Sequence, residues 1–381
     1  MEKIGNAQKN STRAIFFISG FLAASWSPLV PVLRERLFIE EDLLGMLLLC
    51  VGIGSLLTMP LAGAFVSRFG CRKVLTVAAV LAAVNLIILC KIPSFILAVP
   101  AVIFFGAVLG CVDVSMNIQS VVVEKELKHR IMSGMHAMYS VGGFFGAGLF
   151  GVWVGILKLT PFQSTLIAAA IAFAILAKFA KNFIATGGGR GKSDKLIAIP
   201  RGIIIFFGVL ALISYLVEGA VMDWGGVFLT ITKGFDISVA GVGFAMFSAA
   251  MLVMRFVGDS LIQQFSARFV AVGGCVIAFA GFLLLICAES QKLLFAGFFL
   301  IGAGCANIVP IFFSMLGSQK IMPINMAIPA VSTLGYLGIL MGPAVIGFIA
   351  KATSLYFAFG LLAILILIEA TTANYVCKKI N

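Results

Sequence analysis

Residues 43–90 read LLGMLLLCVGIGSLLTMPLAGAFVSRFGCRKVLTVAAVLAAVNLIILC, two long apolar runs separated by a short basic segment. Each run, 43–66 and 74–92, is long enough to cross a bilayer, which takes about 20 apolar residues in a helix. Neither run alternates between polar and apolar side chains as a membrane β-strand does. Because lipid offers the backbone no hydrogen-bond partners, such runs must pair their own backbone groups as helices. The segment therefore predicts two spanning helices joined by a tight loop.

The same pattern continues in both directions along the 381-residue chain. Hydrophobic residues make up 61% of the sequence and charged residues 11%, against about 25% charged in a soluble protein. The mean hydropathy is +1.15, so the surplus apolar surface must face lipid. We expect spans over 14–33, 43–66, 74–92, 96–119, 134–157, 162–182, 202–222, 239–258, 269–288, 292–316, 325–350 and 353–376. The sequence thus predicts an all-α membrane protein with twelve transmembrane helices and no room for a soluble enzymatic domain.

The net charge of +12 comes from basic residues spread over short loops rather than gathered in one patch. A nucleic-acid-binding protein concentrates such charge on one face, so we expect no nucleic-acid partner. Lys and Arg are enriched in cytoplasmic loops, and most of the 27 such residues fall on one side when both termini are placed inside. We therefore expect both termini in the cytoplasm and, for so compact a chain, a bacterial inner (plasma) membrane.

Short matches recur between the two halves of the chain at a nearly constant offset. Phe69-Gly70 after the second span matches Phe265-Ser266 after the eighth. Gly110-Cys111-Val112-Asp113 in the fourth span matches Gly304-Cys305-Ala306-Asn307 in the tenth. We therefore expect two pseudo-symmetric six-helix bundles, 1–182 and 202–381, joined by a cytoplasmic linker, 183–201. Repeats of this kind place a substrate site at their interface near the membrane midplane.

The loop between the second and third spans reads Gly63-Ala-Phe-Val-Ser-Arg68-Phe-Gly70-Cys-Arg72-Lys73. It resembles the loop 2–3 signature of the major facilitator superfamily, and with the 6+6 layout the resemblance covers essentially the whole chain. Residues 113–117 (DVSMN), 136–143 (HAMYSVGG) and 218–224 (EGAVMDW) resemble a bacterial branch related to fucose-permease-like members. The resemblance implies a secondary transporter that works by rocker-switch alternating access. It also implies a cytoplasmic gate, for which we name Gly63, Arg68, Gly70, Arg72, Lys73 and Arg268.

The chain departs from the family pattern at several positions. The signature's aspartate, which helps to latch the gate in the family, is Ser67 here and Gln263 in the second copy. The first span has no carboxylate, unlike the fucose-permease-like members. The fifth span lacks the Gly-Pro of drug antiporters, although Gly342-Pro343 occurs in the eleventh. The signature therefore keeps its basic residues without its usual carboxylate.

Two acidic residues lie deep inside predicted spans, where a charge costs at least a few kcal/mol. Asp113 is in the fourth span with Asn117 one turn further on the same face, and Glu218 is in the outer half of the seventh. We name both for proton coupling, together with His136, whose imidazole can change charge near neutral pH. The alternatives are a neutral Asp113 carboxyl hydrogen-bonded for packing alone, a polar substrate contact for Glu218, and a His136 that is solvated or bonded to a loop carbonyl at a helix end.

Other polar or aromatic residues interrupt the apolar spans, and a cavity for a small solute needs a few such groups. As substrate contacts we name Trp26, Asn117, Tyr139, Asp223, Trp224, Asn307, Asn325 and Tyr336. The alternatives are interhelical hydrogen bonds for the polar groups, a solvated helix end for Asp223 and interfacial anchoring for Trp224. Glu369, near the inner end of the last span, is expected to be peripheral.

The sequence predicts no metal, no cofactor and no enzymatic centre. The eight cysteines form no CxxC pair, and the two histidines have no supporting cluster. An intramembrane enzyme needs clustered catalytic residues, such as a GxSG with His or paired Asp, which the sequence lacks. We expect a monomer whose partners are a small-molecule substrate, protons and the lipid bilayer. The leading interpretation is proton-coupled uptake of a small polar metabolite; the alternatives are proton-coupled efflux of an organic compound and a non-transporting membrane receptor.

Overall fold

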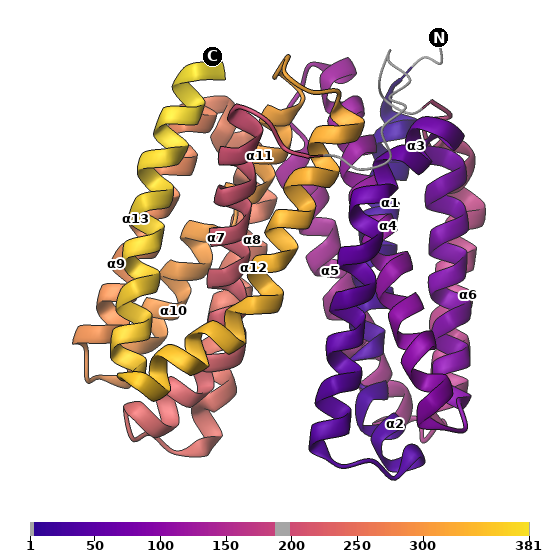
Figure 1. Ribbon diagram of the computed structural model, residues 1–381, viewed down its shortest axis with the longest axis horizontal. Helices are drawn as coiled ribbons and strands as arrows, with labels where there is room; N and C mark the ends of the chain where they lie inside the picture. Colours follow the sequence, from indigo (N-terminus) through magenta and orange to yellow (C-terminus); the bar gives the residue numbers. More distant parts are fainter. Residues whose placement is uncertain (1–3, 187–198, 381) are drawn as a thin grey trace. The chain divides into compact units, whose positions relative to one another are not determined.

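The computed structural model describes residues 4–186 and 199–380, so residues 187–198 of the predicted linker lie outside the described part of the chain. The described chain is almost entirely helical (Figure 1). Its α-helices are α1 (Asn6–Trp26), α2 (Leu29–Leu37), α3 (Glu41–Lys91), α4 (Phe95–Leu127), α5 (Met132–Gly151), α6 (Pro161–Phe179), α7 (Ile203–Val227), α8 (Ala240–Phe265), α9 (Ala267–Cys287), α10 (Gln291–Cys305), α11 (Ile308–Leu316), α12 (Ile324–Ala352) and α13 (Leu355–Ile380). Short helical turns, η1 (Val152–Ile156) and η3 (Phe228–Thr232), extend α5 and α7.

Eleven helical segments of the described chain are long and apolar enough to cross a membrane. One of them, α3, has 51 residues, which is about 76 Å at 1.5 Å per residue, against a hydrocarbon core of about 30 Å. The backbone of α3 breaks at Gly70, where φ is 81° and ψ is 156°. Two passes therefore meet at that corner, and the eleven segments make twelve passes. The predicted all-α fold with twelve transmembrane helices is confirmed.

Two passes are interrupted near prolines. The first runs from Asn6 to Leu37 through α1 and α2, and the tenth from Gln291 to Leu316 through α10 and α11. The first break falls at Ser27-Pro28, and the second falls at Ala306-Asn307, just before Pro310. Proline has no backbone N–H, so it leaves the carbonyl four residues earlier without its helical hydrogen bond. The second break thus exposes an acceptor inside an otherwise apolar pass.

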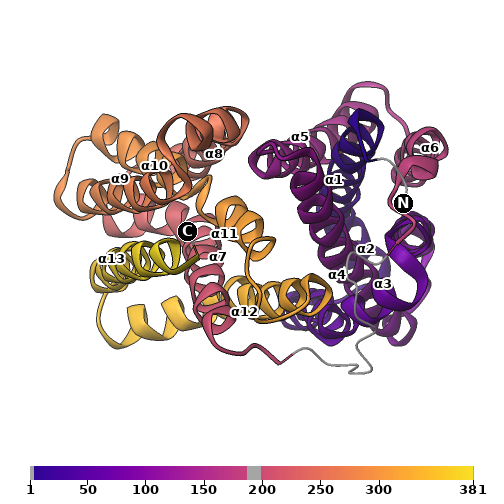
Figure 2. The ribbon, with the colours of Figure 1, turned by 90° about the horizontal axis from the view of Figure 1, so that it is seen from above.

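The chain divides into two compact units. Unit 1 comprises Met1–His129, Met135–Ile199 and Pro323–Ala330, and unit 2 comprises Arg130–Gly134, Pro200–Met322 and Val331–Asn381. Inside unit 1, α3 packs along α4, and α1 contacts α4 and α6. Inside unit 2, α9 contacts both α10 and α13, α8 packs on α10, and α7 packs on α13 (Figure 2). Each unit therefore has its own helix-packed core.

Glycines bring helix backbones into direct contact within each unit. In unit 1, a Cβ on Gly20 of α1 would lie 2.0 Å from the carbonyl O of Tyr139 on α5. In unit 2, a Cβ on Gly338 of α12 would lie 2.2 Å from the carbonyl O of Leu212 on α7. Small residues at such crossings let membrane helices approach closely. The helices of the α1–α5 and α7–α12 pairs therefore cross with their backbones in contact. These close crossings fix the positions of the polar side chains on the four helices.

Candidate functional site

A buried arginine, Arg255 of α8, lies at the centre of the polar groups in unit 2. Its exposed fraction is 8%. Its Nη2 lies 3.9 Å from Oε2 of Glu218 on α7, and its Nε donates to the carbonyl O of Ala306 at 3.3 Å. That carbonyl is available because Pro310 has no N–H to complete the helical hydrogen bond. The break between α10 and α11 therefore supplies the acceptor that holds the guanidinium.

The ion pair between Glu218 and Arg255 is partly exposed on the Glu218 side. The Arg255 side chain is 9% exposed, whereas that of Glu218 is 30% exposed. A single long contact holds its partner less firmly than a short bidentate pair does, so Glu218 can yield its place to another polar group. Glu218 was predicted from the sequence as a site residue, and Arg255 was not. Its position near the end of the predicted span 239–258 made Arg255 indistinguishable from a loop residue.

Asn307 stands at the start of α11, beside the same break. Its Nδ2 donates to the carbonyl O of Met254 at 2.9 Å. Its Oδ1 packs against Gly258 of α8: a Cβ on that residue would lie 2.0 Å from the Asn307 Oδ1, so a larger side chain would not fit. These contacts stay within unit 2 and favour the interhelical hydrogen bond over a substrate contact. Asn307 therefore joins the start of α11 to α8 at Met254, the residue before Arg255.

Glu369 of α13 is fully buried, so the expectation that it is peripheral is wrong. Its Oε1 accepts a hydrogen bond from the Ser214 hydroxyl on α7, and its Oε2 has no hydrogen-bond partner among the described residues. Ser214 and Glu218 are one turn apart, so one face of α7 serves both carboxyl groups. Unit 2 thus carries two carboxyl groups at this face of α7: the buried Glu369, which bonds to Ser214, and the partly exposed Glu218.

Asp113 and Asn117 lie together on α4 in unit 1, as their spacing predicts. The Asn117 Nδ2 donates to the backbone carbonyl O of Asp113 at 2.9 Å, not to its carboxylate. The Asp113 side chain is partly exposed, and among the described residues none donates a hydrogen bond to it or pairs its charge. The Asp113 carboxylate therefore takes no part in the hydrogen bonds and ion pairs among the described residues.

Three aromatic candidates of unit 1 differ in how far they can be reached. Trp26 is buried, with its ring centroid 5.6 Å from that of Phe105. His136 is also buried and lies edge-on to Phe16, with ring centroids 5.4 Å apart. Tyr139, in contrast, is 36% exposed. Of the three rings, Tyr139 is therefore the most exposed.

The candidates of unit 2 on α7 and α12 are spread out. Asp223 is exposed, and Tyr336 is half-buried. Trp224 donates from Nε1 to the carbonyl O of Pro343 at 3.1 Å, which ties α7 to α12. Trp224 therefore stabilises a helix pair, a role that sequence analysis did not consider.

The loop 2–3 signature meets the start of α12 within unit 1. A Cβ on Gly63 would lie 1.9 Å from the carbonyl O of Asn325, so the position accepts glycine alone. The Asn325 Nδ2 donates to the Ser67 hydroxyl. Ser67 stands where the family signature has aspartate, and it replaces a charged contact by a neutral hydrogen bond. Asn325 thus contacts the loop 2–3 signature through both its side chain and its backbone.

The start of α5 is capped by Asp259 within unit 2. Its Oδ1 accepts from the backbone N–H of Ser133 at 3.0 Å, and its Oδ2 accepts from that of Gly134 at 2.9 Å. First-turn N–H groups have no partner inside their own helix, and the helix dipole favours an anion there. Asp259 was not predicted, because the second copy of the signature places its carboxylate at position 263, one turn later, where this chain has Gln263. The signal that could have revealed it is the pair Gly258-Asp259.

The basic gate candidates make different contacts. Arg72 donates from Nε to the carbonyl O of Phe183 at 2.9 Å, which joins the loop 2–3 corner to the segment that follows the sixth pass. Arg268 donates from Nε to Oδ1 of Asn374 at 2.6 Å, which joins α9 to α13 in unit 2. Arg68, Lys73 and Arg268 are exposed, and Arg72 is half-buried.

The described residues hold no group of three His, Cys, Asp or Glu side chains placed to bind a metal ion. All eight cysteines are free thiols, and six of them are buried. The chemistry that the described polar groups offer is proton exchange, ion pairing and hydrogen bonding.

Solved transporters of known structure share this fold. The fucose:proton symporter FucP of E. coli has a TM-score of 0.78 at 17% identity, covering 97% of this chain and 98% of that one. The human organic anion transporter MFSD10 has a TM-score of 0.79 at 16% identity, covering 97% of this chain and 99% of that one. Identities this low establish the shared fold and nothing finer.

Sequence relatives give the family. A family model described as Major Facilitator Superfamily matches residues 14–185. An MFS-type transporter of Yersinia pestis is 40% identical over 376 residues, covering 98% of this chain and 97% of that protein. A transporter of Sinorhizobium fredii is 31% identical, covering 93% of this chain and 95% of that protein. Since such likeness extends over nearly the whole length, this multi-pass membrane protein belongs to the major facilitator superfamily of transporters.

Proposed function

We propose that the protein is a secondary transporter that couples uptake of a small polar metabolite to protons by alternating access. The moving parts are the six-helix bundles 1–182 and 202–381, with 183–201 as a cytoplasmic linker and both termini in the cytoplasm of a bacterial cell. The observation that carries the proposal is the Asp113 carboxyl. It is inside a spanning helix and partly exposed, and it has no partner among the described residues.

A carboxylate without a partner is costly inside a membrane span. Asp113 is therefore stable there either when a proton neutralises it or when water or a solute surrounds it. The protonated carboxyl is neutral, so this face of α4 can lie in apolar surroundings; the ionised carboxylate requires water or a polar partner. A conformer that surrounds Asp113 with apolar groups therefore binds the proton more tightly than one that exposes it to water, and protonation shifts the equilibrium between the two conformers.

The open pair of Glu218 and Arg255 supports a polar solute. The guanidinium is held by the Ala306 carbonyl independently of Glu218, so it stays in place when the carboxylate moves. A metabolite with a carboxylate can pair with the Arg255 guanidinium in place of Glu218, and one with hydroxyl groups can donate hydrogen bonds to the Glu218 carboxylate. An apolar solute offers Glu218 no such replacement partner.

The test begins with a thermal-shift screen of metabolites on the purified protein. A solute that raises the melting temperature is then added outside liposomes that contain the protein and a pH-sensitive dye. We expect solute entry together with acidification of the lumen, and neither in protein-free liposomes. Binding without flux would contradict the proposal and favour a receptor. Flux with protons moving in the opposite direction would contradict uptake by symport and favour proton-coupled efflux.

A further inference from the structure

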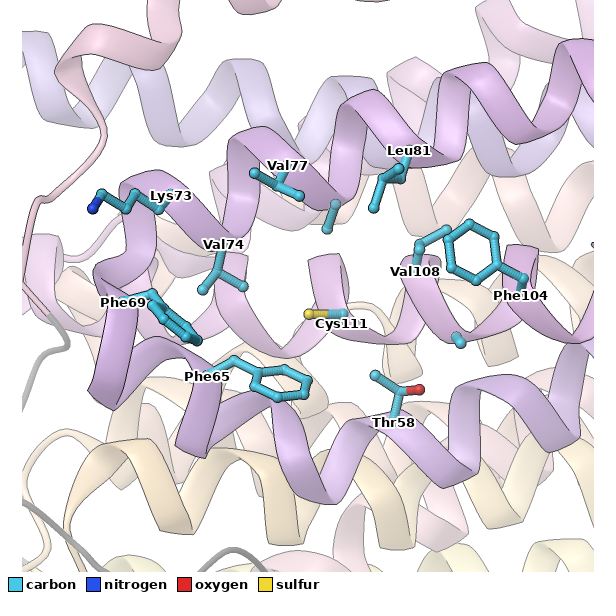
Figure 3. Close-up of a pocket in the computed structure, with 12 residues that line it drawn as sticks. Thr58, Phe65, Phe69, Lys73, Val74, Val77, Leu81, Phe104, Val108 and Cys111 are labelled. Carbon is cyan, nitrogen blue, oxygen red and sulfur yellow. The ribbon is translucent and has the colours of Figure 1, made fainter.

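An apolar groove runs along the outside of unit 1, between the two arms of α3 and α4. Its volume is about 450 Å³. Figure 3 shows Phe65 and Phe69 on one wall, Val74, Val77 and Leu81 on the other, and Phe104 toward one end. The groove is separate from Asp113, Glu218 and the other groups used in the proposed transport mechanism.

The walls of the groove are open to the surroundings. Val77 is 57% exposed, Phe69 48% and Phe104 42%. From Val74 to Leu81 the helix rises about 10 Å, and half of a hydrocarbon core is about 15 Å. The groove therefore follows the depth of one leaflet for most of its length, which suits an extended acyl chain.

A positive charge marks one end of the groove. Lys73 lies there, and its ammonium points away from the apolar walls (Figure 3). It is exposed, and no described residue pairs with it. In the adjoining arm of α3, the Arg68 guanidinium lies 5.3 Å from the centroid of the Phe69 ring. Lys73 is thus the one cation among the residues that line the groove, and the other lining residues are apolar except for Thr58.

We propose that this groove is a binding site for an anionic phospholipid. The phosphate pairs with the Lys73 ammonium, and an acyl chain lies along Val74, Val77 and Leu81. A soluble anion would make no use of the apolar walls, and an apolar small molecule would make no use of Lys73. The phospholipid matches both features, because a basic residue at the membrane surface attracts anionic headgroups and the trough covers the chain beneath.

The test is native mass spectrometry of the full chain, released from mixed micelles with equal amounts of phosphatidylglycerol and phosphatidylcholine. We expect the parent to retain one phosphatidylglycerol with a preference of about fivefold, which corresponds to one cation near the headgroup. Lys73→Gln should reduce this preference to about one. Val77→Trp places an indole ring in the groove where the acyl chain would lie, so it should reduce retention of both lipids.

Two matched variants control for general effects. Lys178→Gln removes a cation that lies over Phe179 at the end of α6, away from the groove. Ile88→Trp adds a ring at a position of α3 that is 50% exposed and does not line the groove. Both should retain phosphatidylglycerol as the parent does. Unchanged preference in Lys73→Gln, unchanged retention in Val77→Trp, or an equal loss in Lys178→Gln would each overturn the proposal.

Discussion

Glu369 has a single hydrogen bond in a fully buried setting, and that bond comes from Ser214. A carboxyl group placed in this way is held as a neutral acceptor, because an isolated charge would be far more costly. We expect Glu369→Gln, which keeps the acceptor oxygen, to change stability by less than about 1 kcal/mol. Glu369→Ala should cost about 2–5 kcal/mol, because it adds a cavity and strands the Ser214 hydroxyl.

Melting temperatures of the purified variants in one detergent check this prediction. The exposed Glu35 provides the control, because Glu35→Gln should leave the melting temperature unchanged. A large loss in Glu369→Gln, comparable to that in Glu369→Ala, would show that Glu369 acts as an anion and that the neutral assignment is wrong.

Asp259 binds two backbone N–H groups at the start of α5. Replacement by asparagine keeps the shape and removes the charge that the helix dipole favours. Asparagine can also accept through one atom where the carboxylate accepts through two. We expect Asp259→Asn to destabilise the protein by about 1–3 kcal/mol, measured as a lower melting temperature. A variant as stable as the parent would mean that this cap contributes nothing to the conformation.

Some site residues could be predicted and others could not, for a physical reason. Asp113 and Asn117 were found because a carboxylate and an amide one turn apart in an apolar run are conspicuous in the sequence. Glu369 was misplaced because α13 is apolar on most sides, so its pattern does not indicate which side faces the unit. Arg255 was missed because its partner is the Ala306 carbonyl, and a backbone acceptor leaves no mark in the side-chain sequence.

At the scale of elements, the crossing of α1 and α5 depends on Gly20. A Cβ there would lie 2.0 Å from a backbone carbonyl, which cannot move as a flexible side chain can. We expect Gly20→Ala to cost about 1–3 kcal/mol, the range for overpacking. Gly148 of α5 has open space around its Cβ position, so Gly148→Ala should be neutral or stabilising.

Thermal unfolding of the two alanine variants, side by side, separates the crossing from general helix propensity. If Gly20→Ala melts at the temperature of Gly148→Ala, the close approach of the two backbones is not a constraint on this fold.

Hydropathy predicted where the passes lie, but it did not predict where their backbones break. The apolar runs predicted the passes, and the basic segment after 43–66 predicted the turn between two of them. The structure adds that this turn is a single-residue break at Gly70 within one long helix. The Ala306-Asn307 break was not predicted, because Pro310 lies inside a run whose hydropathy remains high. Hydropathy measures transfer to lipid and is insensitive to such local changes of backbone.

At the scale of the molecule, the excess of apolar residues accounts for the twelve passes, and the sequence relatives show the family. The two units differ in their polar content. Unit 1 carries the unpaired carboxylate of Asp113, and unit 2 carries the paired charges of Glu218 and Arg255. In the proposed mechanism the first exchanges protons and the second binds the solute. The two units therefore contribute different charged residues to the proposed mechanism.

The most direct test of the central claim compares two kinds of transport in liposomes with the parent and Asp113→Asn. One is accumulation of the solute driven by a pH gradient; the other is exchange of labelled for unlabelled solute without a gradient. We predict that Asp113→Asn keeps exchange and loses accumulation, while Glu126→Gln, at an exposed end of the same helix, keeps both. Undiminished gradient-driven accumulation in Asp113→Asn would contradict the account.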